Sequence, residues 1–108
     1  MDAFYALAEP NRRRIMEILA SSGELPASEI CGKFNVTAQA VSQHLKILLE
    51  VGLLSMEKRS QQRIYQINAD SMQEVEDWIE RTRQLWTARL DRLDRLLEAE
   101  KKKNAKTK

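Results

Sequence analysis

The segment TAQAVSQHLKILLEVG, residues 37–52, decides the fold. Its apolar residues Val41, Leu45 and Leu48 recur at the spacing of one helix face. Thr37 is a residue type that caps a helix start, and Gly52 is the type that ends one. The segment therefore predicts a helix with one buried face, and the side chains on or beside its other face are all polar or charged: Gln39, Ser42, Gln43, Lys46 and Glu50.

The residues before this helix predict a helix-turn-helix. A short helix is expected from Pro26, with Ile30 and Phe34 four residues apart, and the break at 35–37 separates it from the helix that follows. Helix-turn-helix units join their two helices by such short turns. Further upstream we expect a helix over 3–8 and another from Pro10 to about Ser22, stopped by Gly23.

The residues after it predict a β-hairpin and a long helix. Two β-type runs, 53–59 and 63–68, are separated by residues 60–62. Ser71 and Glu74 have capping-box spacing, and a helix can continue from there to about Lys101 without Gly or Pro. The expected fold is mainly α with a small β-hairpin: a winged helix-turn-helix with a long C-terminal dimerisation helix. We expect one domain over 1–101 and a disordered basic tail over 102–108.

Charge is distributed unevenly along a nearly neutral chain. The 108 residues carry 18 basic and 16 acidic side chains, yet segment 31–65 has five basic residues against Glu50 and Glu57. A basic segment that contains the helix-turn-helix and the hairpin favours a nucleic-acid partner. An ordinary solvated helix face is the alternative that periodicity alone leaves open. The arginines at 12–14 allow two interpretations, local ion pairs on a surface helix or a phosphate contact.

Several other classes of protein are not supported. The single cysteine, Cys31, excludes an internal disulfide, and one cysteine with one histidine predicts neither a transition-metal site nor a cofactor. No nucleophile–base pair or Gly-rich phosphate loop indicates an enzyme. No apolar run approaches the roughly 18 residues of a membrane span, and no signal-peptide pattern is present, so a cytoplasmic location is expected.

The last helix has more apolar surface than a small core requires. Apolar residues recur along it every three or four positions, and others widen this stripe. The expected cover is the same helix of a second subunit, and the alternative is a helix that folds back on its own domain. Two-fold symmetry would place two recognition helices about 34–36 Å apart on a roughly palindromic site. The predicted dimer interface contains Phe4, Tyr5, Leu7, Trp78, Ile79, Leu85, Trp86, Leu90, Leu93 and Leu97.

Four stretches together resemble the ArsR family of bacterial winged-helix repressors. They are residues 7–15 (LAEPNRRRI), 41–48 (VSQHLKIL), 52–54 (GLL) and 63–67 (RIYQI), and the string Ser-Gln-His-Leu-Lys is the most specific. The resemblance spans roughly residues 3–98. It implies a dimeric, sequence-specific DNA-binding repressor whose fourth helix enters the major groove. By position it implies these DNA contacts: Arg13, Thr37, Gln39, Ala40, Ser42, Gln43, His44, Lys46, Lys58, Arg59 and Arg63.

Two positions depart from the family pattern. Members usually have glycine at the tip of the hairpin, called the wing, where this chain has Ser60, so the turn must accept a side chain. Metal-sensing members carry two cysteines where Pro26 and Ser28 stand here, and others place histidine on the last helix, which has none. The resemblance is thus to members that lack the metal ligands.

The sequence leaves the regulatory signal open. It gives neither an operator nor regulated genes, and release could follow a small-molecule effector, a redox change at Cys31, or no direct inducer. A winged helix that binds a protein partner without specific DNA readout is the alternative function. The two are separated by salt dependence, because binding through about six or more phosphates weakens by orders of magnitude between 50 and 200 mM salt.

Overall fold

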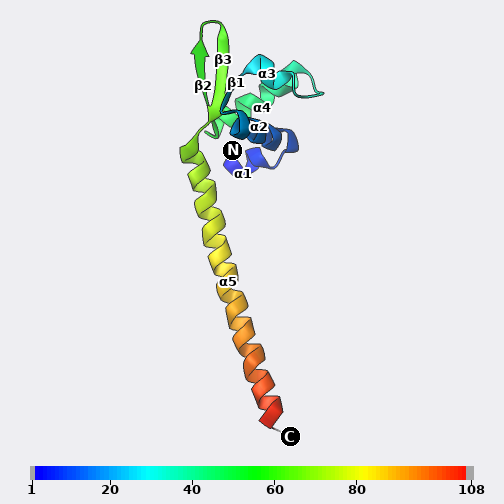
Figure 1. The fold of residues 1–108 in the computed structure, drawn as a ribbon, viewed down its shortest axis with the longest axis vertical. Helices are drawn as coiled ribbons and strands as arrows, with labels where there is room; N and C mark the ends of the chain where they lie inside the picture. The colour runs from blue at the N-terminus through cyan, green and yellow to red at the C-terminus, as the bar shows by residue number, and fades with distance from the viewer. Residues whose placement is uncertain (1, 107–108) are drawn as a thin grey trace. The chain divides into compact units, whose positions relative to one another are not determined.

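The computed structural model describes the backbone of residues 2–106 and the side chains of residues 2–103. The chain divides into two units, one up to Val75 and one from Glu76 onward, which are described separately (Figure 1). No helix within the described residues is long and apolar enough to cross a membrane. The predicted order of helices and hairpin is confirmed, with one additional strand.

The first two helices begin at acidic caps. Helix α1, Ala3–Leu7, is capped by Asp2, whose carboxylate accepts the Tyr5 backbone N–H at 2.9 Å. Helix α2, Pro10–Ser22, is capped by Glu9, which accepts the Arg12 N–H at 2.9 Å. Such carboxylates also favour the positive end of the helix dipole. Gly23 ends α2 with φ of +86°, a conformation that glycine adopts at little cost.

The helix-turn-helix consists of α3, Ala27–Cys31, and α4, Ala38–Glu50. Thr37 caps α4 as predicted, because its hydroxyl accepts the Ala40 N–H at 3.1 Å. Val41, Leu45 and Leu48 are buried, which confirms the predicted core face of α4. Gly52 follows the helix with φ of +81°. These signals are local in sequence, which is why α4 lies close to its predicted bounds.

A three-stranded antiparallel sheet replaces the simple hairpin expected from the sequence. Strands β2, Leu54–Arg59, and β3, Gln62–Ile67, form the wing, and β1, Glu24–Pro26, pairs with the other edge of β3. The third strand was missed because three residues that end in proline show no alternating pattern. The loop between β2 and β3 has two residues, not three, since Arg59 pairs with Gln62.

Helix α5 runs over Ala69–Lys106 and begins earlier and ends later than expected. The predicted Ser71–Glu74 capping box is wrong as the helix start: the Asn68 side chain accepts the Asp70 N–H at 3.2 Å instead. Residues 102–106 of the expected disordered tail are helical, because no glycine or proline interrupts a segment of strong helix formers. Residues 107 and 108 of that tail lie outside the described residues. The domain boundary at 101 stays a prediction.

The core of the first unit joins α2, α3, α4 and the sheet. Its fully buried members include Ile15, Ile30, Leu48 and Leu53. These side chains fix the buried face of α4, and therefore determine which side chains α4 presents to solvent. Burial of this kind contributes about 1.5–3 kcal/mol for each large aliphatic side chain.

Candidate nucleic-acid interface

The polar face of α4 and one face of the wing border a common groove. Its volume is about 330 Å³, and it is lined by Gln39, Ser42, Gln43, Lys46, Leu49, Arg63 and Tyr65. The four polar α4 residues in it are predicted DNA contacts, and all are exposed. Exposed amide, hydroxyl and ammonium groups beside an arginine are suited to base edges and phosphates.

Strand alternation decides which wing residues face this groove. Lys58 lies directly opposite Arg63, so the two side chains share a sheet face. Tyr65, two residues after Arg63 and therefore on the same face, also lines the groove. Two cations side by side repel each other, and a phosphate between them would relieve that repulsion. Arg63 lines the groove, whereas Lys58, on the same sheet face, does not, and the contact of both with a DNA backbone stays a prediction.

Arg59 belongs to the other face of the wing. Its guanidinium donates to Glu24 at 2.6 and 3.1 Å and to Glu57 at 3.0 Å. Hydrogen bonds and charge from these carboxylates raise the pKa of Arg59, and the Arg59 hydrogen bond holds the pKa of Glu24 below its ordinary value. The sequence grouped Arg59 with Lys58 and Arg63. The register separates them, and Arg59 already has two anionic partners.

Three further predicted contacts lie around the start of α4 and on α2. Thr37 is exposed, although its hydroxyl is engaged as the α4 cap, and Ala40 is half-buried. Arg13 is exposed on α2, and its side chain has no ion pair among the described residues. None of the three lines the groove. Their contact with DNA stays a prediction.

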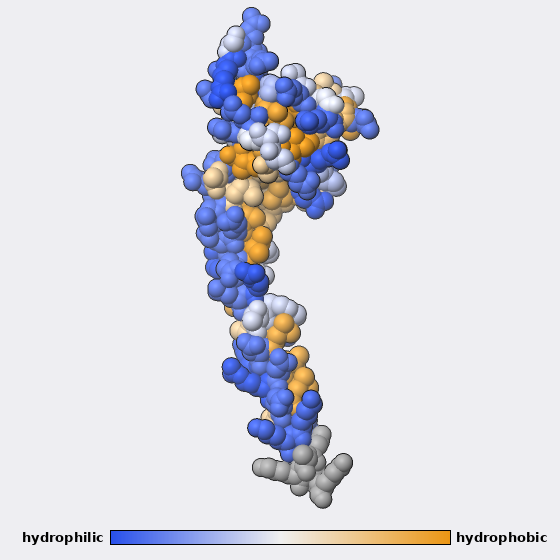
Figure 2. All heavy atoms as spheres, in the orientation of Figure 1, coloured by the Kyte–Doolittle hydropathy of each residue, from blue (hydrophilic) through white to orange (hydrophobic). Residues whose placement is uncertain are grey.

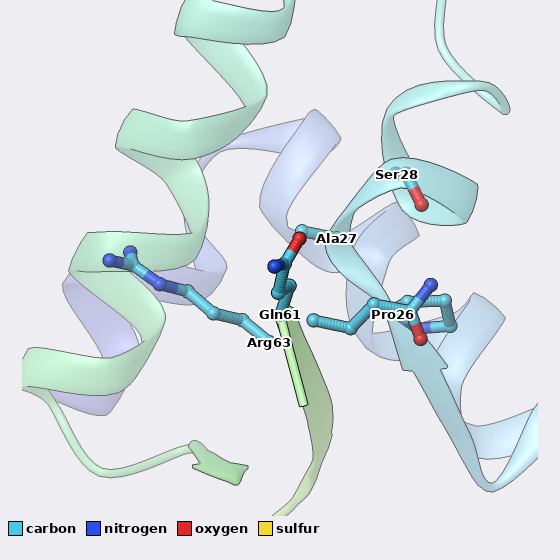
Figure 3. A pocket seen from close by; sticks show the side chains of 6 residues that line it. Pro26, Ala27, Ser28, Gln61 and Arg63 are labelled. Atoms are coloured by element: carbon cyan, nitrogen blue, oxygen red, sulfur yellow. The ribbon is translucent and has the colours of Figure 1, made fainter. Parts of the chain in front are cut away.

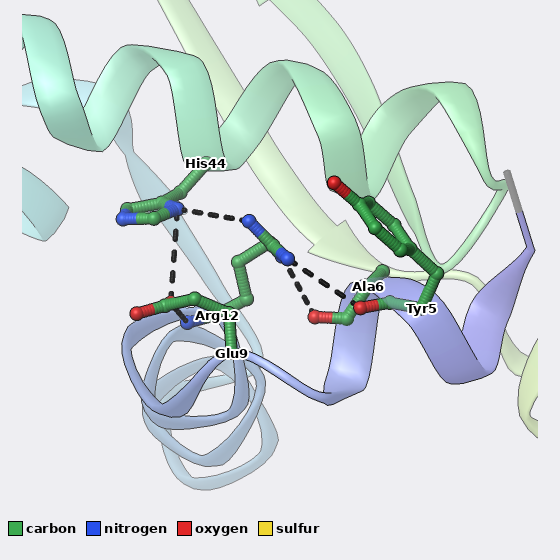
Figure 4. Close-up of polar contacts among 5 residues, drawn as sticks. All are labelled: Tyr5, Ala6, Glu9, Arg12 and His44. Atoms are coloured by element: carbon green, nitrogen blue, oxygen red, sulfur yellow. Dashed lines mark hydrogen bonds and ion pairs between the residues drawn. The ribbon is translucent and has the colours of Figure 1, made fainter.

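His44 points toward α2 and not into the groove (Figure 4). Its Nδ1 lies 3.4 Å from a guanidinium nitrogen of Arg12 and 3.8 Å from a Glu9 carboxylate oxygen. Since a guanidinium can only donate, the Nδ1 atom accepts in this arrangement. His44 therefore links α4 to α2, and the DNA contact that the resemblance implies for it stays a prediction.

Arg12 is the buried member of the arginine run. It is only 7% exposed, its Nε donates to the Ala6 carbonyl at 2.7 Å, and a terminal nitrogen donates to the Tyr5 carbonyl at 3.4 Å (Figure 4). Its guanidinium also stacks 5.5 Å from the Tyr5 ring centre. Arg12 therefore fits neither interpretation given for the run, a surface ion pair or a phosphate contact; it is buried and anchors α1 to α2.

A second hollow lies between the wing tip and the start of α3. Its volume is about 290 Å³, and it is lined by Pro26, Ala27, Ser28, Gln61, Gln62 and Arg63. Arg63 extends away from Pro26 and Ser28, toward a neighbouring helix (Figure 3). Among the described residues, no three His, Cys, Asp or Glu side chains are grouped so that they could hold a metal ion.

Comparisons with known proteins agree with this geometry. Residues 7–57 match a family described as a helix-turn-helix domain. The transcriptional repressor SdpR of Bacillus subtilis is 30% identical over 78 residues, which cover 72% of this chain and 86% of SdpR. The crystal structure of an ArsR family transcriptional regulator is 29% identical with a TM-score of 0.70, and the match covers 77% of this chain and 84% of that one.

The chain belongs to the ArsR family. Another similar structure is the homodimeric winged helix-turn-helix DNA-binding domain Mb0332 of Mycobacterium bovis, 26% identical with a TM-score of 0.58 over 64% of each chain. The predicted family and the predicted winged helix-turn-helix fold are both confirmed. In this ArsR-family chain, the sequence missed two groove-lining residues, Leu49 and Tyr65. The strand alternation of Tyr65 with Arg63 was the signal that could have revealed the second.

The predicted dimer residues fall into two groups. Leu7 is half-buried against the core of the first unit, because its side of α1 packs inward, and its place in an interface stays a prediction. The other nine are exposed, from 42% for Phe4 and Leu90 to 75% for Leu85. Apolar side chains are visible along the second unit among hydrophilic ones (Figure 2). Exposed apolar surface of this extent is typical of an interaction site.

Proposed function

We propose that this chain is a homodimeric repressor that binds a palindromic operator through α4 and the wing. The observation that carries the proposal is the groove in which Gln39, Ser42, Gln43 and Lys46 of α4 face Arg63 of β3. Helix-turn-helix proteins read DNA by placing the second helix of the unit in the major groove. In this chain that helix is α4.

Base reading and backbone contact are assigned to different elements. A glutamine can pair bidentately with adenine, serine can contact several base edges, and lysine can bind guanine or phosphate. Gln43, Ser42 and Lys46 would therefore carry the sequence readout. Lys58 and Arg63 would bind phosphates beside the groove, which fixes orientation and affinity without reading sequence.

The palindromic symmetry of the proposed operator follows from dimerisation. The homodimeric Mycobacterium bovis domain supports a dimer here, as do the exposed apolar residues of α5. A two-fold dimer presents two recognition helices to half-sites about 34–36 Å apart. Occupation of such a site would block a promoter, and a chromosomal operator would place the protein in the cytoplasm. A small-molecule or redox effector stays a prediction.

Selection of bound sequences from random duplex DNA, followed by titration of the selected site, tests this function. We expect a palindromic consensus and an affinity that falls by orders of magnitude between 50 and 200 mM salt. Leu90→Glu should sediment as a monomer and lose affinity for the full palindrome. If no sequence is enriched and binding to any duplex is absent at low salt, the proposal fails and the protein-interaction alternative takes its place.

A further inference from the structure

The apolar side of α5 has a pattern that specifies how two copies would meet. Going along the helix, residues 79, 82, 86, 89, 93 and 96 alternate in steps of three and four, the spacing of a helix–helix seam. Trp78, Leu85, Leu90 and Leu97 flank this seam. Every large apolar residue in the two sets is at least 42% exposed. The face therefore lacks a cover within one copy of the described residues.

A charge lies in the middle of this seam. Arg89 occupies one of its central positions, and the residues three and four positions away in either direction are Leu85, Trp86, Arg92 and Leu93. None of them is acidic, so Arg89 has no partner on its own helix. In contrast, Arg83 on another face pairs with Glu80 one turn earlier. A cover for the seam must also accommodate this cation.

We propose that two copies of α5 pair antiparallel, with the two-fold axis between Thr87 and Ala88 and Arg89 stacked on Trp86 of the second copy. This inference rests on the proposed homodimer and adds its geometry. In this register Ile79 meets Leu96 of the second copy and Thr82 meets Leu93. The two remaining seam residues, Trp86 and Arg89, then meet twice by symmetry, and tryptophan is the best aromatic partner for an arginine.

Parallel pairing of the two helices is unfavourable, because it would bring like charges together. It would place Arg89 against Arg89 and, one step beyond the apolar seam, Glu100 against Glu100. Like charges directly opposed in a partly desolvated seam are unfavourable, and such positions commonly set helix orientation. The charge at position 89 therefore selects against the parallel arrangement.

Neighbouring antiparallel registers pair the seam residues less favourably. A shift of one heptad toward the N-terminus uses Val75, which is only 7% exposed in the first unit, and places Arg89 against Ile79. A shift toward the C-terminus places Ile79 against Lys103 and Arg89 against Leu93. Only the proposed register pairs the aliphatic seam residues Ile79, Leu93 and Leu96 with apolar residues or Thr82, and only this register gives both arginines an aromatic ring.

Disulfide trapping tests the register on the full chain with Cys31→Ser as background. The double variant Thr82→Cys/Leu93→Cys should form a covalent dimer on mild oxidation, because positions 82 and 93 meet across the axis. Each single variant should not, since its two thiols would lie 11 residues, about 16 Å, apart along the helix. In the control Glu80→Cys/Arg95→Cys, the two positions also lie at equal distances from the two-fold axis, but on the face of the helix away from the seam. This variant should not form a crosslink.

The outcomes separate this inference from the proposed function. Crosslinking of either single variant would indicate parallel pairing and overturn the register, while sedimentation and operator binding would still report on the homodimer. A dimer that binds operator but gives no crosslink in the double variant would also overturn it. Arg89→Leu should retain the dimer and permit parallel pairing, so single Thr82→Cys crosslinking should then appear.

Discussion

The guanidinium of Arg12 lies 3.4 Å from the Nδ1 atom of His44, and this contact connects α2 to the candidate recognition helix. The same guanidinium holds the Ala6 carbonyl of α1. One buried cation thus joins three helices. The orientation of α4 relative to α1 and α2 depends on a polar contact as well as on the apolar core.

Replacement of Arg12 by leucine should lower the free energy of unfolding by about 2–3 kcal/mol. The change leaves the Ala6 and Tyr5 carbonyls without their donor, and lost hydrogen bonds to charged groups cost about 1.5–3 kcal/mol. Urea denaturation at fixed protein concentration measures the effect. Arg13→Leu, an exposed neighbour, is the matched control and should change stability by less than about 0.5 kcal/mol. Equal effects of the two variants would contradict the anchoring role.

Arg63→Ala should weaken binding to all duplexes and reduce the slope of log K against log salt by about one unit. Arg59→Ala should reduce the slope less, because Glu24 and Glu57 already pair with that guanidinium. Fluorescence anisotropy over a salt series compares the two variants. A larger loss for Arg59 would mean that DNA displaces its carboxylate partners and that the wing binds through its other face.

Glu24 should titrate below its ordinary glutamate value of 4.5 in the folded protein. Because the folded pKa is depressed, the ion pair with Arg59 contributes at pH above about 4.5 and is lost as pH falls through the folded pKa. Carboxyl-carbon NMR follows this titration directly. In Arg59→Gln the Glu24 midpoint should rise toward the ordinary value, and an unchanged midpoint would assign the shift to another cause.

The sequence predicted those features whose signals are local. Helix α4 was located by its cap, its terminal glycine and its 3.6-residue period, all within 16 residues. Strand β1 was not located, because its three residues form a strand only by pairing with β3, some 40 positions later. Likewise Asn68, not Ser71, caps α5, since the end of β3 fixes where that helix starts.

The candidate site shows the same division. The groove-facing residues of α4 followed from helix periodicity, but the two faces of the wing follow from strand register. A turn of two residues instead of three fixes that register, and it places Lys58 opposite Arg63 with Arg59 on the other face. The burial of Arg12 beside the exposed Arg13 also depends on where α1 packs, which no local pattern shows.

Gln43→Ala should weaken the selected operator by about 1–3 kcal/mol and leave binding to random DNA nearly unchanged. The amide of Gln43 lies in the groove, where it can read a base edge, so its loss removes sequence discrimination and no net charge. Gln66→Ala, an exposed glutamine outside the groove, is the control and should leave both affinities intact. Unchanged specificity in Gln43→Ala would refute the assignment of this helix face.

Ser60→Gly should stabilise the protein by about 0.5–1 kcal/mol. Ser60 is the one non-glycine residue with positive φ, +56°, in the described part of the chain, and it occupies the first central position of a two-residue hairpin turn. Glycine adopts this conformation without steric cost, although its freer unfolded chain offsets part of the gain. Gly52→Ala provides the opposite case, with φ of +81° and Ser71 Oγ 3.1 Å from the new Cβ, and should be destabilising. Denaturant midpoints for both variants test the argument, and a less stable Ser60→Gly protein would show that the serine side chain itself supports the wing tip.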